Sequence, residues 1–203
     1  MQYGALMQES AVELAAAIGG RVRQERQARA WTLDQLAEVA GVSRRMIVSI
    51  EQGATNPSVG TLLRISDALG VGLPSLVAPA EMKPVRVIRS GEGATLWSST
   101  GGGRGVLLAG TESPDVLELW EWTLAPGDEK PSDAHSPRTK EILHVHEGSL
   151  AVQVGGQAYL LGAGDALSFS GDVPHAYANP GNSAVRFTMA ILEPGVGSAA
   201  GLP

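Results

Sequence analysis

Apolar residues recur with a helical period in the first part of the chain and with a strand period in the rest. Over residues 10–78 they fall three or four positions apart, as at Leu14, Ile18 and Val22, which is the spacing of one helix face. Beyond residue 84 they alternate with polar residues, as in 116–124, which is the spacing of half-buried strands. The pattern predicts two domains, an all-α bundle of about five helices followed by an all-β domain.

Turn and cap residues divide the helical region. Thr32 with Gln35 three positions later is a capping box that starts a helix, and Gly41 ends that helix as a left-handed cap. Ser43 caps the next helix, which runs to Gly53. These signals place two helices and a tight turn within about twenty residues, and two further helices follow before residue 78.

Changes in composition set the domain boundaries. We expect an N-terminal tail over 1–9, a helical domain over 10–78, a linker over 79–84, a β domain over 85–195 and a C-terminal tail over 196–203. The linker begins and ends with proline, which favours a semi-rigid connection. The β domain has glycine and proline between its short alternating segments, and this spacing is typical of a barrel or sandwich.

Charge and cysteine usage narrow the protein class. The net charge of −6 lies entirely in the second half of the 203-residue chain, and the first 78 residues are neutral. The absence of cysteine excludes disulfides and thiolate metal sites. No apolar run reaches the roughly 18 residues of a membrane helix, and the first ten residues do not resemble a signal peptide. We therefore expect a soluble cytoplasmic protein with no membrane partner.

The helical region carries a characteristic set of residues around its tight turn. They are Leu36-Ala37, Gly41-Val42-Ser43, Ile47, Ile50-Glu51, Gly53, Asn56-Pro57-Ser58, Thr61-Leu62 and Ala68-Leu69-Gly70-Val71. This set resembles the helix-turn-helix domain of the phage-repressor (XRE) family. The resemblance implies binding to double-stranded DNA, with a recognition helix over 43–52 in the major groove.

The same resemblance implies which residues contact DNA. The implied set is Thr32, Ser43, Arg44, Arg45, Ser49 and Asn56. Within it, the two arginines and Ser49 face base edges, where an arginine fork can read guanine, while Thr32 and Asn56 lie near phosphates. On the first helix Arg26 is expected to be an ordinary surface charge, whereas Glu51 is expected to make a buried polar contact.

The β domain resembles a cupin, a small jelly-roll barrel, over two blocks at 127–148 and 164–179. In metal-binding cupins, histidines and a glutamate from such blocks converge inside the barrel. The residues that match these ligands are His135, Glu141 and His175. Together with Tyr177 they form the predicted effector site. The cofactor stays open between one divalent transition metal held by the three residues and none, in which case they contact an organic effector or hold the fold.

One histidine of the cupin pattern is missing from this sequence. If His135 is the first ligand, the second position is Pro137, which has no donor atom. If His135 is the second ligand, the first is Asp133. Strand alternation from the glutamate turns His144 and His146 away from the pocket, toward the surface or a subunit interface.

An N-terminal helix-turn-helix domain followed by a cupin resembles a group of bacterial one-component regulators. The resemblance implies a homodimer that binds a pseudo-palindromic operator, and a transcription regulator, expected to be a repressor, that a small-molecule effector controls. Under this interpretation, the chain is not expected to be an enzyme. Two alternatives remain: a DNA-binding protein whose cupin only dimerises, and a metal-dependent cupin enzyme fused to a DNA-binding domain.

Overall fold

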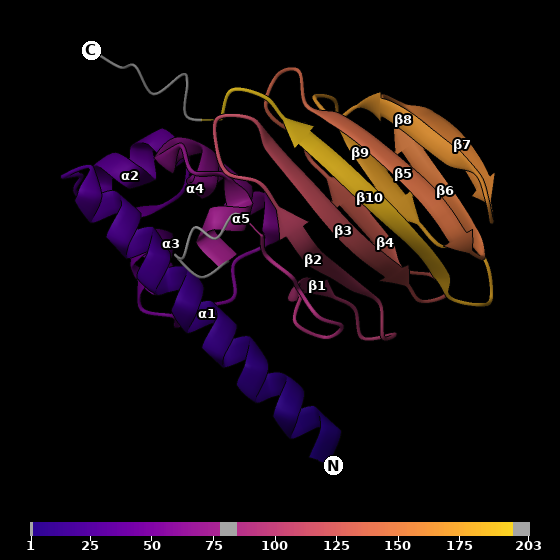
Figure 1. The fold of residues 1–203 in the computed structure, drawn as a ribbon, viewed down its shortest axis with the longest axis horizontal. Coiled ribbons are helices and arrows are strands. Elements are labelled where there is room, and N and C mark those ends of the chain that lie inside the picture. The colour runs from indigo at the N-terminus through magenta and orange to yellow at the C-terminus, as the bar shows by residue number, and fades with distance from the viewer. Residues whose placement is uncertain (1, 78–84, 197–203) are drawn as a thin grey trace. The chain divides into compact units, whose positions relative to one another are not determined.

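The computed structural model describes residues 2–77 and 85–196, with side chains from Val12 onward. The linker predicted over 79–84 lies outside these residues, and so does the predicted C-terminal tail except Val196. The chain divides into two compact units, one built from helices and one built from strands (Figure 1). Their order confirms the predicted fold class of an all-α domain followed by an all-β domain.

The described part of the helical unit contains five helices. They are α1 (Gln2–Ala28), α2 (Leu33–Ala40), α3 (Arg44–Glu51), α4 (Val59–Leu69) and α5 (Gly72–Val77). Because α1 begins at Gln2, the described part of the segment 1–9 is helical, where the hydrophobic pattern predicted a tail. Most residues of this segment have a high helix propensity, so α1 extends beyond the start of its apolar stripe.

The predicted helix boundaries follow from caps that the structure contains. The side chain of Thr32 accepts a hydrogen bond from the backbone of Gln35, and the Gln35 side chain accepts one from the backbone N–H of Thr32. Gly41 ends α2 in the left-handed conformation with φ of 62°. The hydroxyl of Ser43 accepts a hydrogen bond from the backbone of Met46 and so begins α3. These caps satisfy backbone groups that the helices leave unpaired.

The core of the helical unit forms where α1 packs against α3. Ile18 on α1 and Ile47 and Ile50 on α3 are fully or almost fully buried. At Gly19 a Cβ atom would lie 2.2 Å from the carbonyl oxygen of Ile50. The two helices can therefore approach so closely only because residue 19 has no side chain.

The described part of the β unit contains ten strands in two antiparallel sheets. They are β1 (Ala94–Ser98), β2 (Arg104–Gly110), β3 (Val116–Leu124), β4 (Glu129–Ser132), β5 (Lys140–Glu147), β6 (Ser149–Val154), β7 (Gln157–Gly162), β8 (Ala166–Ser170), β9 (His175–Ala178) and β10 (Val185–Glu193). The six-stranded sheet has the order β1-β2-β3-β10-β5-β8, and the four-stranded sheet has the order β4-β9-β6-β7 (Figure 1).

Aromatic contacts show that the two sheets face each other across a shared core. The ring of Tyr177 on β9 lies 6.5 Å from that of Trp122 on β3 and 5.8 Å from that of Phe187 on β10. All three residues are buried. This packing turns one face of the six-stranded sheet inward and leaves the other face outward.

Strand alternation assigns side chains to these two faces as the sequence predicts. On β5 the residues Glu141, Leu143 and Val145 are buried, whereas the intervening positions, including His144 and His146, are exposed. Within the described residues, no helix is both long and apolar enough to span a membrane.

Candidate functional site

Three predicted ligand residues meet inside the β unit. Nε2 of His135 lies 3.0 Å from Oε1 of Glu141, and Nε2 of His175 lies 3.2 Å from the same oxygen. His135 follows β4, Glu141 lies in β5 and His175 begins β9, so the two sheets together supply the cluster. Glu141 and His175 are buried. One potential ligand atom from each residue lies within 4.8 Å of the others.

Backbone hydrogen bonds between two loops position His135. Its N–H donates to the carbonyl of Gly171 over 2.9 Å, and the N–H of Gly171 donates to the carbonyl of Thr139 over 3.0 Å. A Cβ atom at Gly171 would lie 3.0 Å from Oε1 of Glu141 and 3.2 Å from Cδ2 of His135. Glycine thus lets this loop close over the site. Sequence reasoning missed Gly171, because its role comes from contacts with residues distant in the chain.

The ring of His175 is oriented by its second nitrogen. Nδ1 lies 2.8 Å from the carbonyl oxygen of Val173, and because a carbonyl only accepts, Nδ1 carries the hydrogen. In the neutral ring, Nε2 then directs a lone pair toward Glu141. Neither Nε2 of His175 nor Oε1 of Glu141 makes a hydrogen bond within the described part of the chain. A bound cation would stabilise two buried acceptors that face each other in this way.

The donor set fits a divalent transition metal. Two imidazole nitrogens and one carboxylate oxygen form a combination that iron and similar metals use with further positions left open. A backbone carbonyl that fixes the far nitrogen of the ring, as at His175, is the usual arrangement for a metal-binding histidine. The unpaired buried atoms and the types of donor atom therefore both fit a bound divalent metal.

Tyr177 lies beside the three ligand residues. Its hydroxyl donates a hydrogen bond to Oε2 of Glu141. Burial raises the pKa of Tyr177 well above its usual value, and the neighbouring carboxylate adds to this effect. Burial would raise the pKa of Glu141, but when their rings are protonated His135 and His175 outweigh burial and hold this pKa at about 2. The pair is thus a neutral phenol and an ionised carboxylate.

The other predicted positions near the site lie apart from it. Pro137 and Asp133 are exposed, and within the described residues the metal-type cluster consists of three residues that include neither. His144 and His146 are exposed on the outward side of β5, as predicted, and Nε2 of His146 lies 2.6 Å from the hydroxyl of Thr188.

A second buried carboxyl group lies on the inward face of β3. Oε2 of Glu118 accepts a hydrogen bond of 2.8 Å from Nε1 of Trp120, whereas its Oε1 has no hydrogen-bond partner among the described residues. Burial, with the nearby carboxylates of Glu193 and Glu141, raises the pKa of Glu118 to about 8. Glu118 is therefore mostly protonated at neutral pH. The alternation of residues 116–124 puts Glu118 on the same face as Trp120, and this is the sequence signal that could have identified it as a buried carboxyl group.

The predicted recognition helix presents both arginines to solvent. Arg44 and Arg45 lie in the first turn of α3 and are exposed. Nε of Arg44 lies 3.2 Å from Oδ1 of Asp34 on α2, in an exposed ion pair that sequence reasoning missed. Such a pair is worth about 0–1 kcal/mol, so it leaves the guanidinium available to another anion.

The remaining predicted DNA-binding residues surround this helix. Thr32, Ser43 and Asn56 are exposed, and Ser49 is half-buried. The hydroxyls of Thr32 and Ser43 both act as helix caps. These two side chains therefore fix the ends of α2 and α3 as well as lying at the predicted contact surface.

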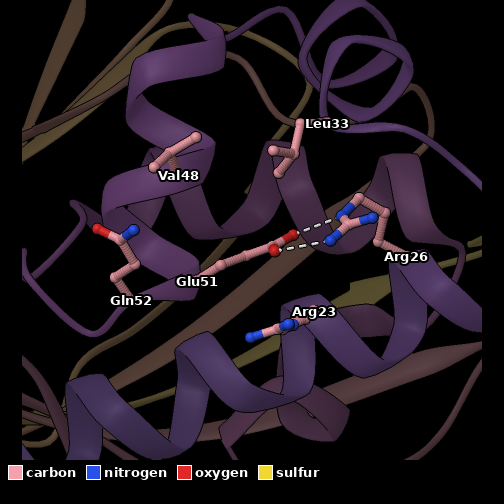
Figure 2. A pocket seen from close by; sticks show the side chains of 6 residues that line it. All are labelled: Arg23, Arg26, Leu33, Val48, Glu51 and Gln52. Atoms are coloured by element: carbon pink, nitrogen blue, oxygen red, sulfur yellow. Dashed lines mark hydrogen bonds and ion pairs between the residues drawn. The ribbon is translucent and has the colours of Figure 1, made fainter.

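Arg26 has a structural role that differs from the surface charge expected for it. Its Nε donates to Oε1 of Glu51 over 2.6 Å and its Nη2 donates to Oε2 over 2.8 Å, while Nη1 donates to the carbonyl of Trp31. Figure 2 shows the two side chains pointing toward each other, from α1 and from the end of α3. The surface prediction for Arg26 is wrong, because the carboxylate that buries it comes from another helix. The buried contact predicted for Glu51 is confirmed.

The pair borders a small hollow of about 220 Å³ between the helices (Figure 2). Its lining residues are Arg23, Arg26, Leu33, Val48, Glu51 and Gln52. Both α1 and α3 contribute to it, so the orientation of the recognition helix is fixed by its contact with the first helix.

Comparisons with known proteins agree with both units. Residues 22–76 match the helix-turn-helix family model, and residues 120–191 match the cupin domain model. The chain is 29% identical to the HTH-type transcriptional regulator SutR of Escherichia coli over 181 residues, which cover 89% of this chain and 97% of SutR. It is 35% identical to the HTH-type transcriptional regulator y4mF of Sinorhizobium fredii over 72 residues, which cover 36% of this chain and 93% of that protein.

A solved structure shows the same two-domain order. The HTH_3 family transcriptional regulator from Vibrio cholerae matches with a TM-score of 0.66 and 26% identity, covering 91% of this chain and 99% of that one. The fold and the exposed arginine helix define a DNA-binding transcription regulator with a cupin as its second domain. The chain belongs to the XRE-type helix-turn-helix transcriptional regulators.

Proposed function

We propose that this regulator works as a homodimer whose cupin barrel binds a small-molecule effector and thereby changes its affinity for an operator. The observation that supports this most strongly is the cluster of His135, Glu141 and His175, in which the buried atoms Oε1 of Glu141 and Nε2 of His175 have no hydrogen bond within the described residues. A fold that needed these side chains only for packing would satisfy them, because unpaired buried polar atoms are costly.

The proposed operator contacts come from α3 and its neighbours. Arg44, Arg45 and Ser49 would read base edges, and Thr32, Ser43 and Asn56 would lie along the phosphates. The exposure of both arginines supports this assignment. A planar guanidinium recognises guanine through two parallel hydrogen bonds, so each half-site is expected to contain guanine.

The proposed effector site includes one divalent transition metal. His135, Glu141 and His175 would hold the ion, and Tyr177 would fix the carboxylate through its hydrogen bond to Oε2. When bound, the metal supplies a Lewis acid that attracts an anionic or chelating group of the effector. The protein residues would exclude water and orient that group.

The regulatory step requires only a modest difference in affinity. An effector that favours one arrangement of the two DNA-binding domains by about 1–3 kcal/mol changes operator occupancy 5–150-fold. Repression is the direction that we propose, and the position of the operator relative to a promoter decides it. A cupin enzyme remains the alternative from another class, because an open metal site also permits catalysis.

Metal content is the first test of this proposal. Protein purified without chelator, and then titrated with Fe²⁺, Mn²⁺ and Zn²⁺, is analysed by elemental analysis beside the variants Glu141→Ala and His175→Ala. His144→Ala is the matched control, since this exposed histidine lies on the opposite face of β5. Near-stoichiometric metal that both site variants lose and the control retains supports the site.

The outcomes separate the functions. Absence of metal in the unaltered protein under all three titrations would overturn the metal assignment. Operator affinity that no candidate effector changes would leave a DNA-binding protein whose barrel only dimerises. Turnover of an effector by the metal-loaded protein would favour the enzyme.

A further inference from the structure

The outward face of the six-stranded sheet exposes a group of large apolar side chains. Leu117 and Leu119 on β3 are 47% and 41% exposed, Ile142 on β5 is 57% exposed and Leu192 on β10 is 40% exposed. These three strands are direct neighbours (Figure 1). Four large apolar residues gathered on one sheet face are typical of a surface that binds a partner.

Strand register arranges this surface, which we term the outer sheet face, in rows across β3, β10 and β5. The first row is Leu117, Leu192 and Lys140; the second is Leu119, Ala190 and Ile142; the third is Glu121, Thr188 and His144. The central strand contributes a small side chain to the second and third rows, and the flanking strands contribute larger ones. In these two rows β10 therefore presents smaller side chains than its neighbours, whereas in the first row it presents Leu192.

We propose that the outer sheet face is the interface between two copies of this chain, related by a two-fold axis that runs along β10. This inference rests on the proposed dimeric function and names the surface that forms the dimer. A rotation about such an axis exchanges the β3 side of one copy with the β5 side of the other.

The exchange matches side chains of complementary chemistry in the second and third rows. In the first row it sets Leu117 on Lys140 of the partner subunit, whose apolar stem can lie along the leucine. Leu119 comes to face Ile142 of the partner subunit, so apolar surface meets apolar surface in the second row. In the third row Glu121 faces His144 of the partner subunit, so an acid meets a group that can donate a hydrogen bond. Ala190 lies on the axis, where its small side chain lets the two sheets approach the usual separation of about 10 Å.

The other two-fold arrangement in the plane of the sheet fits poorly. An axis across the strands through the row of Ala190 reverses their direction and places Leu117 on Glu121 of the partner subunit. It also places Lys140 on His144 of the partner subunit. This arrangement would set the carboxylate of Glu121 against an apolar side chain, whereas the axis along β10 sets it against an imidazole.

The polar end of the face is already neutralised within each copy. Arg186, which follows the third row on β10, lies 3.1 Å from Glu121 and 3.5 Å from Glu147. The guanidinium also lies near the proposed axis, so it comes close to Arg186 of the partner subunit. The two carboxylates offset the repulsion between these like charges.

The size of the face is that of a stable dimer interface. With the axis along β10, the five strands β2, β3, β10, β5 and β8 overlap between the copies. At about 4.8 Å between strands and about 3.3 Å per residue along the nine-residue β10, the overlap spans roughly 24 by 30 Å. This gives about 700 Å² per copy, within the roughly 600–1,000 Å² per partner of standard interfaces.

Paired substitutions on the full chain test the interface by analytical ultracentrifugation. We expect the unaltered protein to sediment as a dimer, and Ile142→Glu and Leu119→Lys to sediment as monomers, with the dissociation constant raised at least about 100-fold. The double variant restores the dimer, because each introduced acid faces the introduced base of the other copy. Leu160→Glu is the control, since Leu160 is 71% exposed on β7 of the other sheet.

Several results would overturn this interface. A dimer that persists in both single variants places the contact elsewhere, and failure of the double variant to reassociate excludes the proposed axis. Unaltered protein that sediments as a monomer at the concentrations used for operator binding would overturn the interface as well. Metal and operator binding are measured on the same samples, so failure of the proposed function is recognised separately from failure of the interface.

Discussion

Arg26 and Glu51 join the first helix to the end of the recognition helix through two parallel hydrogen bonds of 2.6 and 2.8 Å. Both side chains are largely buried. The third contact of the guanidinium, with the carbonyl of Trp31, fixes the segment that leads into α2. One ion pair therefore sets the relative positions of three parts of the DNA-binding unit.

Removing one partner of this pair is expected to destabilise the helical unit. Glu51→Gln leaves the buried guanidinium without a counter-charge and should cost about 3–5 kcal/mol of unfolding free energy. Chemical denaturation monitored by circular dichroism measures the loss. Glu25→Gln is the control, because Glu25 pairs with Arg29 at a more exposed position and should cost below about 1 kcal/mol. Equal losses in the two variants would contradict the structural role of the pair.

The two recognition arginines are expected to govern operator affinity without affecting stability. Arg44→Ala and Arg45→Ala should each weaken operator binding by about 1–3 kcal/mol, or 5–150-fold, because each removes a proposed base contact. Both residues are exposed, so the unfolding midpoint should stay unchanged. Fluorescence anisotropy at fixed ionic strength, with selected operator DNA, measures the effect.

A charge-matched control distinguishes base contacts from general electrostatics. Arg64→Ala removes the same charge from an exposed position on α4 outside the predicted contact set. It should change operator affinity less than either recognition variant. The base-contact assignment fails if all three variants weaken specific and non-specific DNA equally.

Asp34 is expected to restrain Arg44 in the absence of DNA. Asp34→Asn removes the carboxylate 3.2 Å from the guanidinium and should tighten operator binding modestly, by up to about 1 kcal/mol. The effect should disappear in the background Arg44→Ala, and a double-mutant cycle of operator affinities measures this coupling. An equal gain in both backgrounds would show that Asp34 acts only through the net charge.

Gly171 is expected to set the positions of the ligand side chains in the cluster of His135, Glu141 and His175. Gly171→Ala places a methyl group 3.0 Å from Oε1 of Glu141 and 3.2 Å from the ring of His135, so the two ligands must move apart. Metal titration followed by calorimetry should show affinity reduced at least about tenfold. Gly162→Ala, whose added Cβ meets the nearest described atom at 3.7 Å, should retain affinity. Normal metal binding in Gly171→Ala would show that the loop does not set the ligand geometry.

Glu118 is expected to make the stability of the β unit depend on pH. Its pKa is about 8 in the folded protein and 4.5 as the ordinary value. Between these values the folded state keeps a proton that the unfolded state releases, so the free energy of unfolding falls as pH rises from 4.5 to 8 and then levels off. The full contribution is on the order of 3–5 kcal/mol.

Substitution by the neutral amide isolates this contribution. Glu118→Gln can still accept the hydrogen bond from Trp120 and does not titrate, so its stability relative to the unaltered protein should increase from pH 5 to pH 9. Urea denaturation at several pH values, followed by tryptophan fluorescence, measures the difference. Parallel pH profiles for the two proteins would assign the dependence to other groups.

Local sequence signals determined most of the helical unit. The capping box at Thr32, the left-handed glycine at 41 and the serine cap at 43 place α2 and α3 within one or two residues of their observed bounds, because a cap acts on backbone groups only a few positions away. Alternation likewise placed Glu141 and His144 on opposite faces of β5, as the structure has them, since side chains of a strand alternate with a period of two.

The tertiary structure decided what those side chains meet. Nothing near Arg26 in the sequence identifies Glu51 as its partner, and nothing near Gly171 indicates that its missing side chain makes room for Glu141 and His135. Register between strands also brings Leu119, Ala190 and Ile142 into one row. Periodicity and capping depend on neighbours along the chain, whereas ion pairs, close approaches and surface rows depend on which distant segments pack together, and that is fixed only when the core forms.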